Sequence, residues 1–60
     1  MAVWALLEDG RQVAAFRSIR NDIAREDCEA EALANCLAFM LPTGLALAPG
    51  VEIVCLQDDD

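Results

Sequence analysis

The chain has 60 residues, of which 57% are hydrophobic, and it carries eleven Asp and Glu against four Arg, for a net charge of -7. This length allows one small domain, residues 1–60, with a thin core. The apolar content is too high for intrinsic disorder. The negative field opposes direct binding to nucleic acid or to an anionic membrane, and it favours a basic protein partner.

The first predicted element is a β-hairpin. Residues 2–7 and 12–18 are apolar-rich runs, and the Asp-Gly pair between them indicates a type I′ turn. A two-residue turn predicts an unbroken register that ends with Val3 opposite Phe16. One face then carries Trp4, Leu6, Val13 and Ala15, and the other carries Val3, Ala5, Leu7, Ala14 and Phe16. Both faces of the predicted hairpin are therefore apolar.

A helix is predicted after the hairpin. Residues 26–41 are rich in Ala, Glu and Leu, which favour helix, and Asn21 and Asp22 precede them as candidate N-caps. Pro42 and Gly44 are expected to end the helix. The predicted core face of a helical wheel gathers Ala30, Leu33, Ala34, Leu37, Met40 and Leu41. The predicted outward face gathers Asp27, Cys28, Glu31, Asn35 and Phe39.

The last predicted strand is residues 51–57, behind a Pro-Gly turn signal. Residues 45–48 are expected to form a short strand or an ordered loop over Phe39. The element order ββαβ predicts a two-layer α+β domain, with one helix packed on a three-stranded sheet that includes the N-terminal hairpin. If the third strand starts at the end of the molecule that holds the hairpin turn, it ends beside the start of the helix and brings the C-terminal acids there. A connection that crosses the molecule before the strand would place these acids at the opposite end.

The acidic residues form the main candidate binding surface. They are Asp22, Glu26, Asp27, Glu29 and Glu31 around the predicted helix, and Asp58, Asp59 and Asp60 at the C-terminus. In one interpretation they complement the helix dipole and solvate the chain. In the other they imitate phosphates and occupy the basic groove of a nucleic-acid-binding protein. Asp27 and Glu31 fit the second interpretation best, because they share the predicted outward face, whereas Glu26 and Glu29 point nearer the core.

A second candidate surface is the face of the sheet that a single helix leaves uncovered. A symmetric dimer, a larger partner, or residues 45–48 folded back with the N-terminus would cover it. Phe39 is either a binding anchor or is covered by its own loop. The basic residues Arg17, Arg20 and Arg25 are expected to pair with neighbouring acids rather than to contact phosphate.

Catalysis has little support in this sequence. His, Lys and Tyr are absent, and the acidic neighbours of Cys28 oppose ionisation of its thiol. The number of cysteines is odd, and the N-terminal residues lack the basic region of a secretory signal. Both observations indicate reduced thiols in the cytoplasm. On one helix Cys28 and Cys36 would lie roughly 12 Å apart, too far to form a disulfide or share a metal ion. We expect no enzyme activity, cofactor or metal, and a thiol-dependent enzyme is the third-ranked hypothesis.

In its size, charge, Ala- and Arg-rich composition and α+β pattern, the chain resembles the small acidic phage-encoded inhibitors of bacterial defence, including anti-CRISPR proteins. The resemblance implies a non-catalytic inhibitor in the cytoplasm of a bacterial host. As a DNA mimic it would occupy the basic DNA-binding groove of a CRISPR-type effector, with Asp27, Glu31 and their neighbours carrying the mimicry. The alternative is a structural or regulatory module, such as an antitoxin-like subunit, that associates through its sheet as a homodimer.

Overall fold

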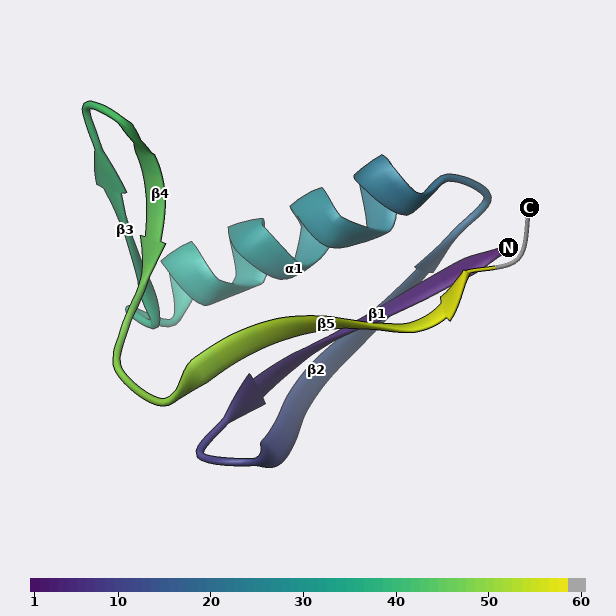
Figure 1. Cartoon of the computed structure of the whole chain (residues 1–60), viewed down its shortest axis with the longest axis horizontal. Coiled ribbons are helices and arrows are strands. Elements are labelled where there is room, and N and C mark those ends of the chain that lie inside the picture. Colours follow the sequence, from purple (N-terminus) through teal and green to yellow (C-terminus); the bar gives the residue numbers. More distant parts are fainter. Residues whose placement is uncertain (59–60) are drawn as a thin grey trace.

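The structure is a computed structural model that describes residues 1–58. Its elements are β1 (Ala2–Glu8), β2 (Arg11–Ser18), α1 (Asn21–Ala34), β3 (Ala38–Leu41), β4 (Gly44–Leu47) and β5 (Val51–Asp58). An antiparallel sheet has the strand order β2-β1-β5, and β3 and β4 form a separate two-stranded sheet. Helix α1 lies over one face of the three-stranded sheet (Figure 1). The predicted α+β class and the helix on a three-stranded sheet are confirmed, but the predicted order ββαβ lacks the β3–β4 hairpin.

The N-terminal hairpin forms with the predicted turn. Asp9 has φ 52° and Gly10 has φ 82°, which are the two positive φ values of a type I′ turn. The unbroken register is wrong beyond this turn, because the pairing shifts between Leu6 and Leu7. Val13 is the extra residue of the resulting β-bulge.

The bulge changes which side chains share a face. It places Trp4 opposite Phe16, whereas an unbroken register would put these two aromatic residues on opposite faces. Trp4 lies on the helix side, since its Nε1 donates a hydrogen bond of 2.9 Å to Oδ1 of Asn21 in α1. Both aromatic side chains therefore lie under the helix, and the opposite face of β1 carries Val3 and Leu7.

The helix begins earlier than predicted, at Asn21. The N-cap residue is Arg20, which makes no side-chain capping bond, so the predicted caps Asn21 and Asp22 are wrong. Asn21 instead uses its amide in tertiary contacts with Trp4. The Asp22 carboxylate accepts a hydrogen bond from the backbone N–H of Ile23, within the first turn.

The helix also ends earlier than predicted, at Ala34, well before Pro42. The Cys36 N–H donates to the carbonyl of Leu33, and the Leu37 N–H donates to that of Ala32. This pair of bonds, with Cys36 at φ 60°, is a Schellman motif. Residues 38–41 therefore form β3 instead of the predicted end of the helix. The short strand that was one of two alternatives for residues 45–48 forms as β4.

The buried face of α1 is opposite to the predicted one. Ala24, Cys28 and Ala32 are each 0% exposed, whereas Leu33 is 38% exposed. The spacing of these three small residues puts them on one side of the helix. Their small side chains let the helix backbone approach a sheet whose large residues, including the fully buried Leu6, point toward it.

The core is thin, as the chain length predicts. Leu6 and Cys28 are the largest fully buried side chains among the described residues. Its main cluster joins β1, α1, β3 and β5 through Leu6, Ala32, Ala38 and Val51. No helix within residues 1–58 combines the length and the apolar character needed to cross a membrane.

Candidate protein-binding surface

The C-terminal acid lies at the start of the helix. Strand β5 runs antiparallel to β1, which places Asp58 opposite Ala2. The side chain of Asn21 joins the elements, because its Nδ2 donates to Oδ1 of Asp58 while its Oδ1 accepts from Trp4. Of the two directions left open for the last strand, the structure therefore has the one that brings its C-terminal end to the helix start. The other two predicted acids of this group, Asp59 and Asp60, lie outside the described residues.

Asp22 is compensated within the chain. Arg20 donates two hydrogen bonds to its carboxylate, of 3.0 and 2.8 Å. This hydrogen bonding, together with the positive charge of Arg20, lowers the pKa of Asp22 below its usual range. The predicted ion pairing is correct for Arg20 and wrong for Arg17 and Arg25, which make no ion pair within residues 1–58. Asp22 has less charge to offer a partner than its helical neighbours.

The central acids of α1 are not compensated. Glu26 and Asp27 are exposed and Glu29 is half-buried, and none of the three makes a side-chain hydrogen bond or ion pair with another residue in the range 1–58. They also lie beyond the first turn, where Asp22 is the acidic residue that meets the helix dipole. Helix capping therefore does not explain these carboxylates, and they remain free to pair with an external cation.

The predicted ranking of the acids changes with the orientation of the helix. Because Cys28 faces the sheet, Glu26 points to the outside, and its assignment near the core is wrong. The expectation that Glu31 lies on the outward face is wrong too, since Glu31 is half-buried. Its Oε2 accepts a hydrogen bond of 3.0 Å from Nδ2 of Asn35, which also donates to the Glu31 carbonyl at 2.8 Å.

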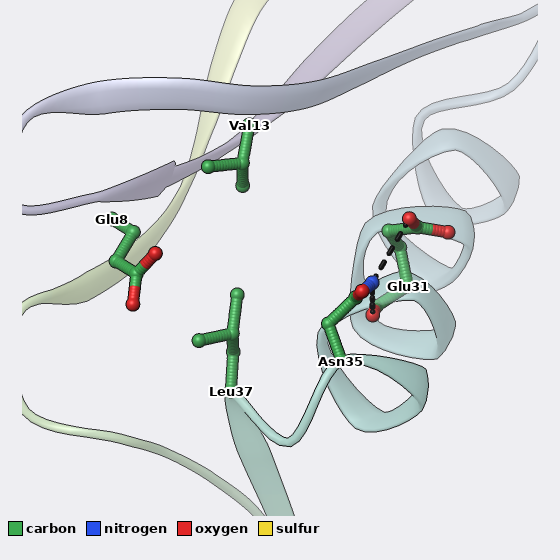
Figure 2. A pocket seen from close by; sticks show the side chains of 5 residues that line it. All are labelled: Glu8, Val13, Glu31, Asn35 and Leu37. Atoms are coloured by element: carbon green, nitrogen blue, oxygen red, sulfur yellow. Dashed lines mark hydrogen bonds between the residues drawn. The ribbon is translucent and has the colours of Figure 1, made fainter.

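Glu31 lines a cavity of about 330 Å³ between the hairpin and the C-terminal part of α1. Its lining residues are Glu8, Val13, Glu31, Asn35 and Leu37. Figure 2 shows the carboxylates of Glu8 and Glu31 on opposite sides, with Val13 and Leu37 between them. Two carboxylates beside apolar walls suit a cationic side chain with a methylene stem, such as that of Arg.

Two of the cavity residues had no signal in the sequence. Val13 was assigned to a regular strand position, but the bulge makes it the extra residue of β2. Bulges of this kind re-aim side chains, and here Val13 points into the cavity toward Leu37 (Figure 2). Glu8 closes the hairpin opposite Arg11, but nothing in the sequence shows that it faces α1.

The Cys28 thiol offers little nucleophilic character. All three cysteines are free, and Cys28 is fully buried in the helix–sheet interface. Burial raises the pKa of the Cys28 thiol, and the negative charges of Asp27 and Glu29 raise it further. The Cys28 thiol is therefore protonated at neutral pH, in agreement with the predicted influence of its acidic neighbours.

Apolar side chains form two further surfaces. Val3, Leu7 and Val54 lie on the sheet face away from α1 and are only half-buried. No segment of residues 1–58 lies over this face (Figure 1), and residues 45–48 do not cover it, because Leu45 packs against the core on the helix side. The predicted alternative that residues 45–48 fold over it is therefore wrong.

The second apolar surface is the hairpin of β3 and β4, called the arm (residues 38–47). Phe39 is on β3 rather than on a helix and is 52% exposed, so no loop of its own covers it.

The chain matches no protein-family model, no curated protein and no solved structure in comparisons with known proteins. A functional proposal therefore depends on the acidic helix, the cavity and these apolar surfaces.

Proposed function

We propose that this protein is a non-catalytic binding protein whose acidic helix docks on a basic protein surface. The observation that carries the proposal is that Glu26, Asp27 and Glu29 have no internal partner in the described chain and no role at the helix terminus. Carboxylates held on one rigid helix pair with Arg and Lys across an interface and speed the encounter with a basic partner.

The cavity between Glu8 and Glu31 supports the same proposal. A docked partner places one Arg side chain there, with its methylenes on Val13 and Leu37 and its guanidinium between the carboxylates. Arg is the cation of choice because its planar group forms paired hydrogen bonds with carboxylates. The helix acids would then supply attraction, and the cavity would supply an anchor.

The partner we propose is the basic groove of a nucleic-acid-binding protein, which the acids occupy in place of phosphates. A groove whose Arg and Lys side chains pair with phosphates can form charge pairs of the same kind with carboxylates fixed on a helix. The resemblance to phage-encoded inhibitors implies a CRISPR-type effector as one such partner, and we propose it as the partner on that basis. Inhibition follows because the groove cannot hold DNA and the acidic helix together.

An affinity capture experiment tests this function. The whole chain is immobilised, a bacterial lysate is passed over it, and bound proteins are released with double-stranded DNA and identified. We expect DNA to release a nucleic-acid-binding protein that an immobilised Glu26→Lys/Asp27→Lys variant does not retain. Captured proteins that DNA leaves in place, or that the variant retains equally, would refute the decoy function.

A second candidate function is a structural or regulatory module that associates through its sheet. The uncovered face with Val3, Leu7 and Val54 favours it. Leu7→Lys places a charge on that face and should dissociate such a complex, whereas Leu6 is unsuitable for this test because it lies in the core. Loss of the partner in Leu7→Lys, with full retention in Glu26→Lys/Asp27→Lys, would select this function over the acidic decoy.

A further inference from the structure

The arm belongs to a segment without charge. Residues 32–51 contain no Asp, Glu, Lys or Arg, although the chain carries eleven acidic and four basic residues elsewhere. The arm rises from the C-terminal end of α1 and projects away from the three-stranded sheet (Figure 1). A long uncharged stretch in so acidic a chain marks a surface where a second negatively charged molecule can approach with the least repulsion.

The arm is apolar on both of its faces. Phe39 is 52% exposed and Leu41 is 50% exposed on one face, and Met40, on the alternate face, is 67% exposed. The arm meets the core through the buried Ala38 and through the half-buried Leu45, which lies opposite Met40. Core packing therefore explains these two side chains but not the three large exposed side chains of β3.

The outer edge of β3 has no strand beside it in the described chain. The Ala48 N–H donates to the carbonyl of Leu37, so these two residues form a hydrogen-bonded pair at the base of the arm. Hydrogen-bonded and non-hydrogen-bonded pairs alternate along antiparallel strands, and Met40 with Leu45 is therefore a non-hydrogen-bonded pair. The backbone N–H and C=O of Met40 consequently point away from β4. Strand β3 contains no charge and no Pro, the usual devices that protect an open edge. A two-stranded ribbon is also marginal by itself, and it gains from a further strand.

We propose that the outer edge of β3 pairs with β3 of a second copy of this chain, giving a four-stranded antiparallel sheet across a two-fold axis. A two-fold axis sets identical strands antiparallel, so each open edge meets its complement. The contact brings Phe39, Met40 and Leu41 of one copy against those of the other, and aromatic and aliphatic cross-strand pairs favour it.

Three features favour a second copy over an unrelated occupant. The edge is self-complementary, the uncharged segment lets two copies of net charge -7 meet away from their acidic helices, and the core is small. Domains of this size commonly gain stability by oligomerisation, because one small core supplies little. Pairing at β3 leaves Glu26 and Asp27 free, so the proposal does not depend on the acidic decoy function.

Sedimentation velocity over a wide range of protein concentration tests the proposal. We expect twice the 6.5 kDa chain mass at high concentration, and monomer for Met40→Lys. The matched control is Ile19→Lys, which alters a side chain that is 81% exposed but lies outside the arm, and it should dimerise like the natural chain. Circular dichroism checks that both variants are folded.

Amide hydrogen exchange on the natural chain gives a second readout that needs no variant. We expect exchange at the Met40 N–H to slow as the concentration rises, because this group becomes hydrogen-bonded only in the dimer. A monomer at every concentration overturns the proposal, even if another protein or a lipid vesicle binds the arm. A dimer that survives Met40→Lys but dissociates in Leu7→Lys also overturns it, since the contact is then the sheet face.

Discussion

Replacing Ala32 by Leu tests which face of α1 meets the sheet. Ala32 is 0% exposed and lies in the core cluster with Leu6 and Val51. A Leu side chain adds several carbon atoms where the packed sheet leaves no room for them. Overpacking of this kind costs roughly 1–3 kcal/mol. We therefore expect Ala32→Leu to be clearly destabilised.

Ala30→Leu is the matched control. Ala30 is exposed, although the helical wheel placed it in the core, and the two substitutions change helix propensity by the same small amount. An exposed substitution of this type changes the free energy of unfolding by about 0.5 kcal/mol or less. A chain of 60 residues has a total stability of about 3–9 kcal/mol, so the cost at Ala32 is a large share of it.

Urea and thermal unfolding, followed by circular dichroism, measure the difference. In a domain this small, 1 kcal/mol shifts the Tm by about 4–8 °C, so Ala32→Leu should lower the Tm by roughly 4–24 °C and Ala30→Leu by only a few degrees. If Ala30→Leu were the more destabilised variant, the helix would present the face predicted by the wheel. The outward position of Glu26 would then be wrong as well.

Three further predictions concern the turns and the thiols. Gly50→Ala and Gly10→Ala should each destabilise the chain by about 1–3 kcal/mol, because both residues have φ 82°, where a side chain strains the backbone. At position 50 the Cβ would also lie 2.3 Å from Oδ1 of Asp9, but this is the movable end of an exposed side chain, so the two costs should be similar in a urea titration; no loss of stability in either variant would contradict the positive φ values. In the folded chain a thiol reagent should label Cys55 quickly and Cys28 only after unfolding, and fast labelling of both would contradict the burial of Cys28. The free energy of unfolding should also fall as the pH rises above 9.0, the ordinary pKa of the thiol. At such a pH the Cys28 thiol of the unfolded chain loses a proton that it keeps in the folded chain. Cys28→Ala should show a smaller fall.

The local signals in the sequence predicted the sheet well. An Asp-Gly pair between apolar runs predicted the hairpin, because positive φ at both positions is what a type I′ turn requires. The β-rich run after Pro49-Gly50 predicted β5, and one of the two strand directions that the sequence allowed puts Asp58 at the helix start, where the structure has it. Each of these signals is short-range or follows from simple chain geometry.

The helix was harder to predict because its core face has small side chains. A wheel weighted toward large apolar residues selected Leu33 over Ala24 and Ala32, whereas close approach to Trp4 and Leu6 favours alanine and cysteine. The end of the helix was missed for a related reason. Cys36 takes the left-handed position that Gly usually occupies, so the chain carried no visible stop signal before Pro42.

The bulge and the arm depend on contacts between elements. The extra residue Val13 places Phe16 opposite Trp4, and that gain exists only when a helix covers both rings. Strand β3 of the arm forms from residues predicted as the helix end, so the wheel placed the exposed Met40 in the core. Strand β4 agrees with the short strand that was one of two alternatives for residues 45–48. Both features shape the candidate surfaces, one by lining the cavity and the other by opening an edge.

The most direct test of acidic docking is the salt dependence of the affinity between this chain and the partner that DNA displaces from it. Glu26→Lys is compared with Glu52→Lys, an equal change in charge at an exposed residue of β5. We predict that the affinity of the natural chain and of Glu52→Lys falls steeply with salt, and that Glu26→Lys binds more weakly with a flatter slope. An affinity that does not respond to salt, or equal losses in the two variants, would contradict docking through the acidic helix.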